Sequence, residues 1–170
     1  KIMEVITGGV TAAKGFKAAA TAAGIKYKDR TDMAMIVSAV PAVSAGTFTT
    51  NVVKAAPVKW DRQTVESQEY AQAVVVNAGI ANACTGEEGM SYCKKTADVV
   101  QEVLDIPAEQ VLVASTGVIG MQLPIDRIQN GVKALAPKLS DSKESGHEAA
   151  CAIMTTDTKP KEVAVTFEVE

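Results

Sequence analysis

Hydrophobic residues recur at helical spacing in two segments of the second half of the chain. The first follows Thr85 and the second follows Pro124, a residue that the first turn of a helix tolerates because its missing N–H group would have no partner there. Apolar positions three and four residues apart share one face of a helix, so each segment predicts a helix that packs on a core. The first stripe is Met90, Cys93, Ala97, Val100 and Leu104, and the second is Ile125, Ile128, Val132 and Leu135.

Two further helices are expected from other signals. Asp61 is a suitable N-cap residue for a helix that runs to about Tyr70, and residues 145–154 are interpreted as a last helix. The segment from Gly15 to Gly24 leaves two interpretations open. Its alanines suit a helix capped by Gly24, and they equally suit a strand of small side chains packed tightly against another element.

Short apolar runs predict buried strands elsewhere in the chain. From Val163 to Val169, hydrophobic residues alternate with Ala164, Thr166 and Glu168, the period of a strand with one buried face. The mixture of strands and helices indicates a layered α/β or α+β fold. The apolar runs are Ile2–Ile6, which ends at Gly8-Gly9; Asp32–Ala39, which we expect to stop at Pro41; Ala73–Asn77; and Val111–Ser115.

Length and charge narrow the class of protein. With 170 residues, 47% of them hydrophobic, the chain is interpreted as a single domain over 1–170 that builds its core without disulfides or a structural metal. Seventeen Lys and Arg residues stand against 20 Asp and Glu, and no basic stripe is present, so nucleic acid is not an expected partner. No apolar run approaches the roughly 20 residues that cross a bilayer, so neither a membrane segment nor a signal peptide is predicted.

Metal and nucleotide chemistry find no support in the sequence. Cys84, Cys93 and Cys151 lack CxxC spacing and only one histidine is present, which indicates a reduced cytoplasmic chain without a metal or other cofactor. His147 is interpreted as a solvated residue on a helix face, and Cys84 as a buried small residue rather than an activated thiol. The region of Lys14 departs from a phosphate loop and GxGxxG is absent, so ATP and NAD are not expected.

Two polar segments are candidates for ligand binding. Ala114-Ser115-Thr116-Gly117 leaves a predicted strand, where glycine allows close approach and two adjacent N–H groups can stabilise an oxyanion. The alternative is an ordinary tight turn. Met154-Thr155-Thr156-Asp157-Thr158 gathers three hydroxyls and a carboxylate, and its alternative is the end of a helix with turn hydrogen bonds.

Five segments, in this order along the chain, carry a resemblance to one enzyme family. They are Gly8–Phe16, Phe48–Asn51 together with Ala55–Val58, Val76–Gly86, Ala114–Gly120 and Ala152–Thr158. Together they resemble the amino half of the bifunctional ornithine acetyltransferase / glutamate N-acetyltransferase of arginine biosynthesis. Ala78 and Ile80 stand where that family more usually has Ser and Asn.

The resemblance implies an α-β-β-α-type sandwich of the N-terminal-nucleophile ornithine acetyltransferase fold, and the α chain of a precursor that cleaves itself. The nucleophile is then the first threonine of the β chain, and its own α-amino group can act as the base. Thr116 and Gly117 match the family's oxyanion hole. Thr155 matches a substrate-binding threonine, with Thr156 as the alternative. The family's Lys-Gly-Ser-Gly-Met-rich segment does not follow Glu170, so the last part of the α chain is expected to be absent.

The implied reaction moves the acetyl group of N2-acetylornithine to glutamate in two half-reactions, and some family members accept acetyl-CoA as donor. The implied partner is the β chain, in an α2β2 assembly. Two rival functions stay open: a self-processing aminopeptidase of the related fold, and a stand-alone binding or scaffold domain.

Overall fold

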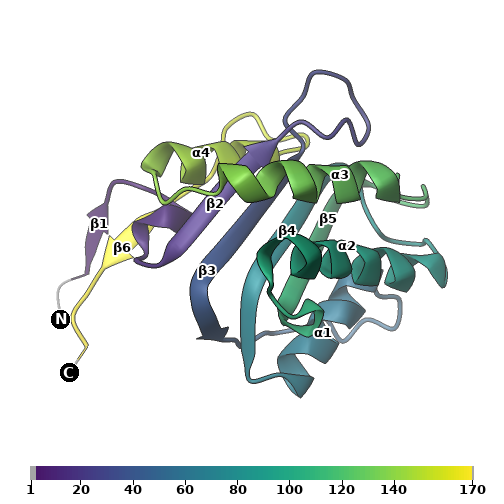
Figure 1. The fold of residues 1–170 in the computed structure, drawn as a ribbon, viewed down its shortest axis with the longest axis horizontal. Coiled ribbons are helices and arrows are strands. Elements are labelled where there is room, and N and C mark those ends of the chain that lie inside the picture. The colour runs from purple at the N-terminus through teal and green to yellow at the C-terminus, as the bar shows by residue number, and fades with distance from the viewer. Residues whose placement is uncertain (1–2, 170) are drawn as a thin grey trace.

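A four-stranded sheet with helices on both faces forms the body of the molecule (Figure 1). The computed structural model describes residues 3–169. The sheet has the order β2-β3-β4-β5, and a separate two-stranded ribbon pairs β1 with β6. The strands are β1 (Glu4–Ile6), β2 (Phe16–Thr21), β3 (Met33–Val43), β4 (Tyr70–Ile80), β5 (Val111–Val118) and β6 (Ala164–Thr166). The helices are α1 (Ala56–Ser67), α2 (Glu88–Leu104), α3 (Ile125–Leu135) and α4 (Lys143–Ala152), with single turns η1 (Val10–Ala12), η2 (Ala108–Gln110) and η3 (Ala136–Lys138).

The connection between β4 and β5 fixes where the two strands end. β2, β3 and β4 are antiparallel neighbours, whereas β4 and β5 are parallel and are joined through α2. Parallel strands need such a crossover, which returns the chain to the same end of the sheet. The carboxyl ends of β4 and β5 therefore lie side by side, with Ala78 opposite Thr116 and Gly79 opposite Gly117.

The main core lies between one face of the sheet and helices α1, α2 and α3. Both predicted helical stripes are confirmed, because their central residues are buried in this core. On α1, the Trp60 indole Nε1 donates a hydrogen bond of 2.8 Å to the Val111 carbonyl and so ties the helix to the edge strand β5. The largest fully buried side chains include Met33, Met35, Val75, Val100, Val132 and Leu135.

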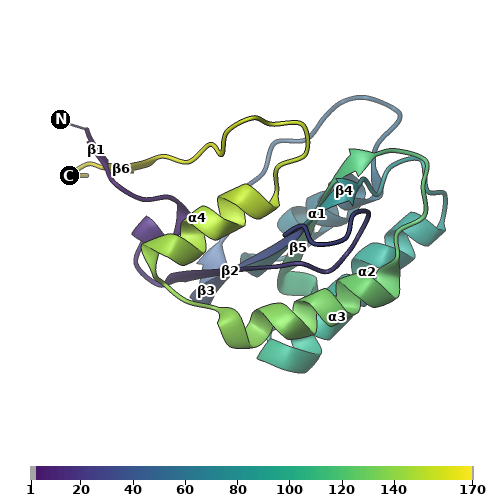
Figure 2. The same cartoon turned by 90° about the horizontal axis from the view of Figure 1, so that it is seen from above.

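Helix α4 covers β2 and β3 on the opposite face, as Figure 2 shows. The contact is made of small residues: Ala18 and Ala34 on the sheet against Ala149 and Ala152 on the helix. The segment between Gly15 and Gly24 is therefore a strand, β2, which decides between the two sequence interpretations. Small side chains let α4 approach β2 closely, and this packing outweighs the intrinsic preference of alanine for a helix.

The start of α4 is held by two hydrogen bonds. Ser142 caps the first turn by accepting from the Ser145 N–H at 3.1 Å. The Thr11 hydroxyl donates to the Ser142 carbonyl at 3.0 Å, which connects η1 to the start of the helix. The predicted last helix is confirmed, beginning two residues earlier and ending two residues earlier than expected.

The expected start of α1 is wrong. The helix begins at Ala56 with Pro57 in its first turn, and Tyr70 already belongs to β4. Asp61 lies inside the helix, and its carboxylate accepts a hydrogen bond of 2.9 Å from the Val113 N–H. Asp61 is therefore not the N-cap of α1, because its carboxylate accepts a hydrogen bond from the Val113 amide of β5 and not from the first turn of the helix.

The expected stop at Pro41 is also wrong. β3 continues through Pro41 to Val43, and its register against β4 shifts between Val37 and Ala42. A proline cannot donate to a ladder, but an irregularity of the register removes the need for its N–H group.

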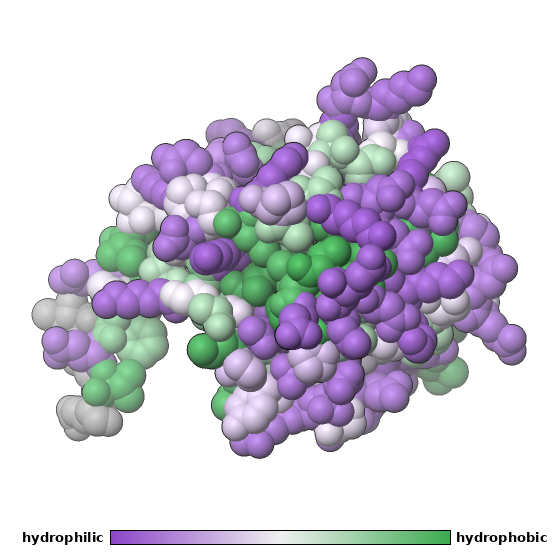
Figure 3. Space-filling view, in the orientation of Figure 1, coloured by the Kyte–Doolittle hydropathy of each residue, from purple (hydrophilic) through white to green (hydrophobic). Residues whose placement is uncertain are grey.

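Only part of the C-terminal segment with alternating hydrophobic residues, 163–169, forms a strand. β6 covers Ala164–Thr166 and pairs with β1, and Ala164 is the buried residue while Val163, Val165 and Phe167 are exposed. The predicted buried face is therefore the wrong one. The β1–β6 ribbon projects from the body, and hydrophobic side chains appear on the surface of this projection at the left of Figure 3. Ile2, part of the first predicted strand, lies outside the described residues.

The α+β class expected from the sequence is confirmed. Between residues 3 and 169, no helix combines the length and the apolar character that crossing a membrane would require. Over the same residues, no group of three or more His, Cys, Asp or Glu side chains is arranged to hold a metal ion.

Candidate functional site

Two glycines, Gly79 and Gly117, pack closely together at the carboxyl ends of the parallel strands β4 and β5. Gly117 has a φ of +134°, and a Cβ atom built on it would overlap the Gly79 carbonyl and lie 2.8 Å from the Ile80 nitrogen. Only glycine fits such an approach of two backbones. Thr116, half-buried, and Gly117, exposed, stand at the outer edge of the sheet, because β5 is its last strand.

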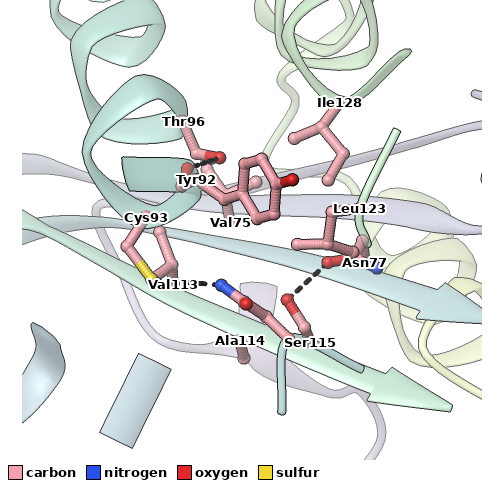
Figure 4. A pocket seen from close by; sticks show the side chains of 11 residues that line it. Val75, Asn77, Tyr92, Cys93, Thr96, Val113, Ala114, Ser115, Leu123 and Ile128 are labelled. Carbon is pink, nitrogen blue, oxygen red and sulfur yellow. Dashed lines mark hydrogen bonds between the residues drawn. The ribbon is translucent and has the colours of Figure 1, made fainter. Parts of the chain in front are cut away.

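Side-chain hydrogen bonds also hold this end of β5 to β4. The Ser115 hydroxyl donates to the Asn77 Oδ1 atom at 2.6 Å, and the Asn77 amide donates to the Ile80 carbonyl at 2.9 Å. Figure 4 shows Asn77 and Ser115 joined in this way beside Tyr92 and Leu123. Asn77 is buried, so its bonds form away from water and hold the peptide that precedes Thr116.

The loops that leave β4 and β5 are joined to each other. The Ala81 N–H donates to the Val118 carbonyl and the Gly120 N–H donates to the Ala83 carbonyl, both at 2.9 Å. Two of the five motifs, 76–86 and 114–120, are thus one unit in space. A third motif, 55–58, joins them, because the Ala56 N–H donates to the Asn82 carbonyl at 3.2 Å.

Asn82 is the centre of this unit and is 2% exposed. Its amide donates to the Gly89 carbonyl at 2.8 Å and to the Cys93 sulfur at 3.4 Å, and its Oδ1 accepts from the Thr85 hydroxyl at 2.7 Å. The side chain therefore links the loop after β4 to the first turns of α2.

The second candidate segment, 154–158, begins where α4 ends. The Arg30 guanidinium donates to the Met154 carbonyl at 2.6 Å and to the Thr155 carbonyl at 3.3 Å. The Thr155 N–H bonds the Asp157 carboxylate, which also pairs with Lys161. These contacts lower the pKa of Asp157, with the Lys161 hydrogen bond as the main cause. Thr155 is half-buried, whereas Thr156 is exposed.

Arg30 and the neighbouring Asp32 connect the two candidate segments. The buried Asp32 carboxylate accepts from the Ala23 and Ile25 N–H groups at 2.7 and 2.6 Å. Its carbonyl accepts from the Ala78 N–H at 2.8 Å, and Ala78 is the register partner of Thr116. The sequence reasoning missed Arg30, because nothing in its local pattern signals a bond to residues more than 120 positions away.

Two titratable groups, half-buried Asp61 and buried Cys93, lie against β5. Burial raises the pKa of Asp61 to about 6, although the Val113 N–H bond opposes the shift. Burial, together with the charge of Asp61, raises the pKa of the Cys93 thiol to about 12. Cys93 is therefore protonated and unreactive at neutral pH.

Asp61 leads to a pH-dependent prediction. Because its pKa is higher in the folded protein than the ordinary 3.8, the folded state holds a proton that the unfolded state has lost, and stability falls as the pH rises from about 4 to 6. Asp61→Asn keeps an oxygen acceptor for the Val113 N–H without the charge. We expect it to raise the free energy of unfolding by about 1 kcal/mol at pH 8, after discounting for solvent screening, and by much less at pH 4.5.

Thermal unfolding of both forms at the two pH values measures this difference. A variant that is equally destabilised at both pH values would contradict the assignment.

Cys84 departs from its sequence interpretation, whereas His147 agrees with the expected position on a helix face. Cys84 is exposed and has a φ of +57°, so it is not a buried small residue. His147 does lie on an exposed helix face, but its ring contacts Glu162 and Cys151.

These features define a class: a layered α+β protein whose parallel strands β4 and β5 end with two closely packed glycines and with hydroxyl residues beside them. The chain belongs to the ArgJ family, whose model matches residues 17–170. It is 49% identical over 165 residues to the arginine biosynthesis bifunctional protein ArgJ of Thermosynechococcus vestitus, covering 97% of this chain. It is 50% identical over 169 residues to the protein of the same name from Symbiobacterium thermophilum, covering 98% of this chain.

The same fold occurs in solved structures. A crystal structure of the arginine biosynthesis bifunctional protein ArgJ from Bacillus halodurans aligns with a TM-score of 0.89 at 42% identity, over 97% of this chain and 86% of that one. Ornithine acetyltransferase from Mycobacterium tuberculosis, in complex with ornithine, aligns with a TM-score of 0.91 at 42% identity, over 96% of this chain and 88% of that one. The expected family and fold are confirmed. The chain spans about 40% of the length of its curated relatives, 39% and 41% for the two above.

Proposed function

We propose that this chain is the α part of an acetyltransferase that transfers the acetyl group of N2-acetylornithine to glutamate. The observation that carries the proposal is the close contact of Gly79 with Gly117, which constrains the backbone at Thr116 and Gly117 near the end of the edge strand β5. A constrained backbone is what an oxyanion hole needs, because preorganised N–H donors stabilise charge that develops only in the transition state. The family membership and the ornithine bound to one relative support the same reaction.

In the proposed mechanism, the amides of Thr116 and Gly117 face the acetyl carbonyl oxygen. The attacking hydroxyl belongs to the first threonine of a β chain produced by self-cleavage, and the α-amino group of that threonine takes the proton. The tetrahedral intermediate collapses to an acetyl-threonine as the acetyl carbon–nitrogen bond breaks, and the α-amino group returns its proton to the nitrogen of the departing ornithine. The amino group of glutamate then attacks the acetyl-threonine, through a second oxyanion in the same hole, to give N-acetylglutamate.

Thr155 is the proposed substrate-binding threonine, with Thr156 as the alternative. Arg30 supports the assignment, because its two bonds hold the backbone at Met154 and Thr155. The proposal includes a cytoplasmic α2β2 assembly without a resident cofactor, and leaves acetyl-CoA as an additional donor to be measured.

The assembled protein tests the reaction. It is incubated with N2-acetylornithine and glutamate, with acetyl-CoA and glutamate, and with small peptide amides. Ornithine release that depends on glutamate supports the proposal, and hydrolysis of the peptide amides alone would favour a self-processing aminopeptidase. Intact-mass analysis that finds no accompanying chain with an N-terminal threonine would favour a stand-alone binding domain.

The two threonines can be separated by substitution. We expect Thr155→Ala to raise the KM for N2-acetylornithine about tenfold, the cost of roughly one hydrogen bond to a charged ligand, while exposed Thr156→Ala changes it less than about twofold. Steady-state kinetics of the two variants measure this. The reverse order would move the assignment to Thr156, and two unchanged KM values would remove the segment from the site.

A further inference from the structure

A cysteine, a histidine and a carboxylate form a chain of contacts on the exposed side of α4. His147 and Cys151 lie one turn apart, with the His147 Nε2 atom 3.6 Å from the Cys151 sulfur. The Nδ1 atom of the same ring lies 2.8 Å from the Glu162 Oε1 atom. Glu162 comes from the segment that returns after α4, so tertiary structure and not helix periodicity brings the third group into place.

The Glu162 carboxylate packs against Gly9. A Cβ atom at Gly9 would lie 2.7 Å from the Glu162 Oε2 atom, so a side chain there would push the carboxylate aside. Beside it is a hollow of about 340 Å³ bordered by Glu162 and by Gly146 and Ala150, the residues that precede His147 and Cys151 on α4. Glu162 is the member of the group that borders this hollow, and the half-buried Cys151 is reached from the exposed side of α4.

The contacts assign the protons. A carboxylate only accepts hydrogen bonds, so the His147 Nδ1–H group donates to Glu162. The Nε2 atom that faces the thiol is then free to accept a proton from it. A nucleophile, a base and a group that orients the base are the three parts that activate a thiol.

We propose that Cys151 is a modification site that reacts with low-molecular-weight disulfides. The Cys151 sulfur attacks one sulfur of the disulfide while His147 Nε2 takes the thiol proton. A bond forms between the Cys151 sulfur and that sulfur, and the original sulfur–sulfur bond breaks. The expelled thiolate receives the proton from His147 and leaves as a thiol, so Cys151 is oxidised and the expelled half is reduced. Glu162 is a positioning residue.

The other two cysteines provide internal comparisons. Cys93 is buried and protonated, so it reacts only if the protein opens. Cys84 is exposed, but the chain has a single histidine, which is committed to Cys151, so Cys84 lacks such a base. If exposure alone set the rate, Cys84 would react faster with disulfides, whereas the proposal predicts that Cys151 reacts faster.

The test uses the assembled protein, reduced and then treated with oxidised glutathione, with adducts at each cysteine followed by peptide mass mapping over time. We expect Cys151 to be modified about ten times faster than Cys84, and Cys93 to stay unmodified. His147→Gln is expected to slow Cys151 about tenfold and Glu162→Gln several-fold, with Cys84 unchanged as the reference in each variant. Glu148→Gln, an exposed neighbour on α4, is the matched control and leaves all rates unchanged.

Two results would overturn the proposal. One is a Cys84 rate in the unmodified sequence equal to or above that of Cys151. The other is a ratio of the Cys151 and Cys84 rates that His147→Gln leaves unchanged. A gain of Cys93 adducts in a variant would report opening of the fold, and Glu162→Gln then carries the test in its place. No acetyl transfer is measured, so the outcome is independent of the proposed function.

Discussion

Gly117→Ala is expected to lower kcat for acetyl transfer by roughly 10²–10³, the usual cost of losing an oxyanion-hole donor. The added Cβ would overlap the Gly79 carbonyl, and the φ of +134° is one that alanine rarely adopts. The end of β5 must therefore move away from β4, and the amides at 116 and 117 move with it. Thr116→Ala keeps the amide in place and is expected to cost only about tenfold.

Gly120→Ala is the matched control for this change. Gly120 also has a positive φ, +77°, but a Cβ there meets nothing within 4 Å. It therefore introduces left-handed backbone strain, of about 1 kcal/mol, without the collision. Steady-state kinetics on assembled protein compare the two variants. Equal losses of kcat in both variants, or unchanged kcat in Gly117→Ala, would refute the role of the close contact between Gly79 and Gly117.

Asn82→Ala is expected to lower the free energy of unfolding by about 3 kcal/mol. The substitution leaves the buried Gly89 carbonyl and Thr85 hydroxyl without the partners they have in the folded protein. Unsatisfied polar groups of this kind cost roughly 1–3 kcal/mol each, and the small cavity adds to the loss. Urea unfolding measures the change.

Asn130→Ala serves as the comparison, because Asn130 is exposed on α3 and is expected to change stability by less than about 0.5 kcal/mol. A loss below about 1 kcal/mol in Asn82→Ala would show that water replaces the amide bonds and that Asn82 does not hold the loop after β4 to α2.

The amphipathic helices could be predicted because their sequence pattern is also their packing pattern. The stripes of α2 and α3 fall on residues such as Val100 and Val132, which the core buries. β2 could not be decided, because alanine has no side chain large enough to show a periodicity. The partner that selects the strand is α4, more than 120 residues away.

The candidate site could be located but not assembled from the sequence. Thr116 and Gly117 were singled out by their place after a predicted strand that ended at Ser115, but β5 continues through both residues to Val118, and its register sets Gly117 against Gly79. Their role as an oxyanion hole stays a prediction. The role of Arg30 and the contact of Glu162 with His147 depend on chain segments that meet only in the folded protein. The prediction that Val163 lies on a buried strand face was wrong for the same reason. The β1–β6 ribbon projects from the body, so no core covers that face.

The alanine surface between α4 and the sheet has a consequence for Thr155. Ala18 and Ala34 against Ala149 and Ala152 present few protrusions that interlock, so packing alone offers little resistance to sliding of the helix along its axis. Two polar anchors set its longitudinal position instead: Thr11 at one end and Arg30 at the other. Arg30 donates directly to the Thr155 carbonyl, so its removal would release that part of the backbone, and removal of Thr11 would let the helix shift Thr155 from its far end.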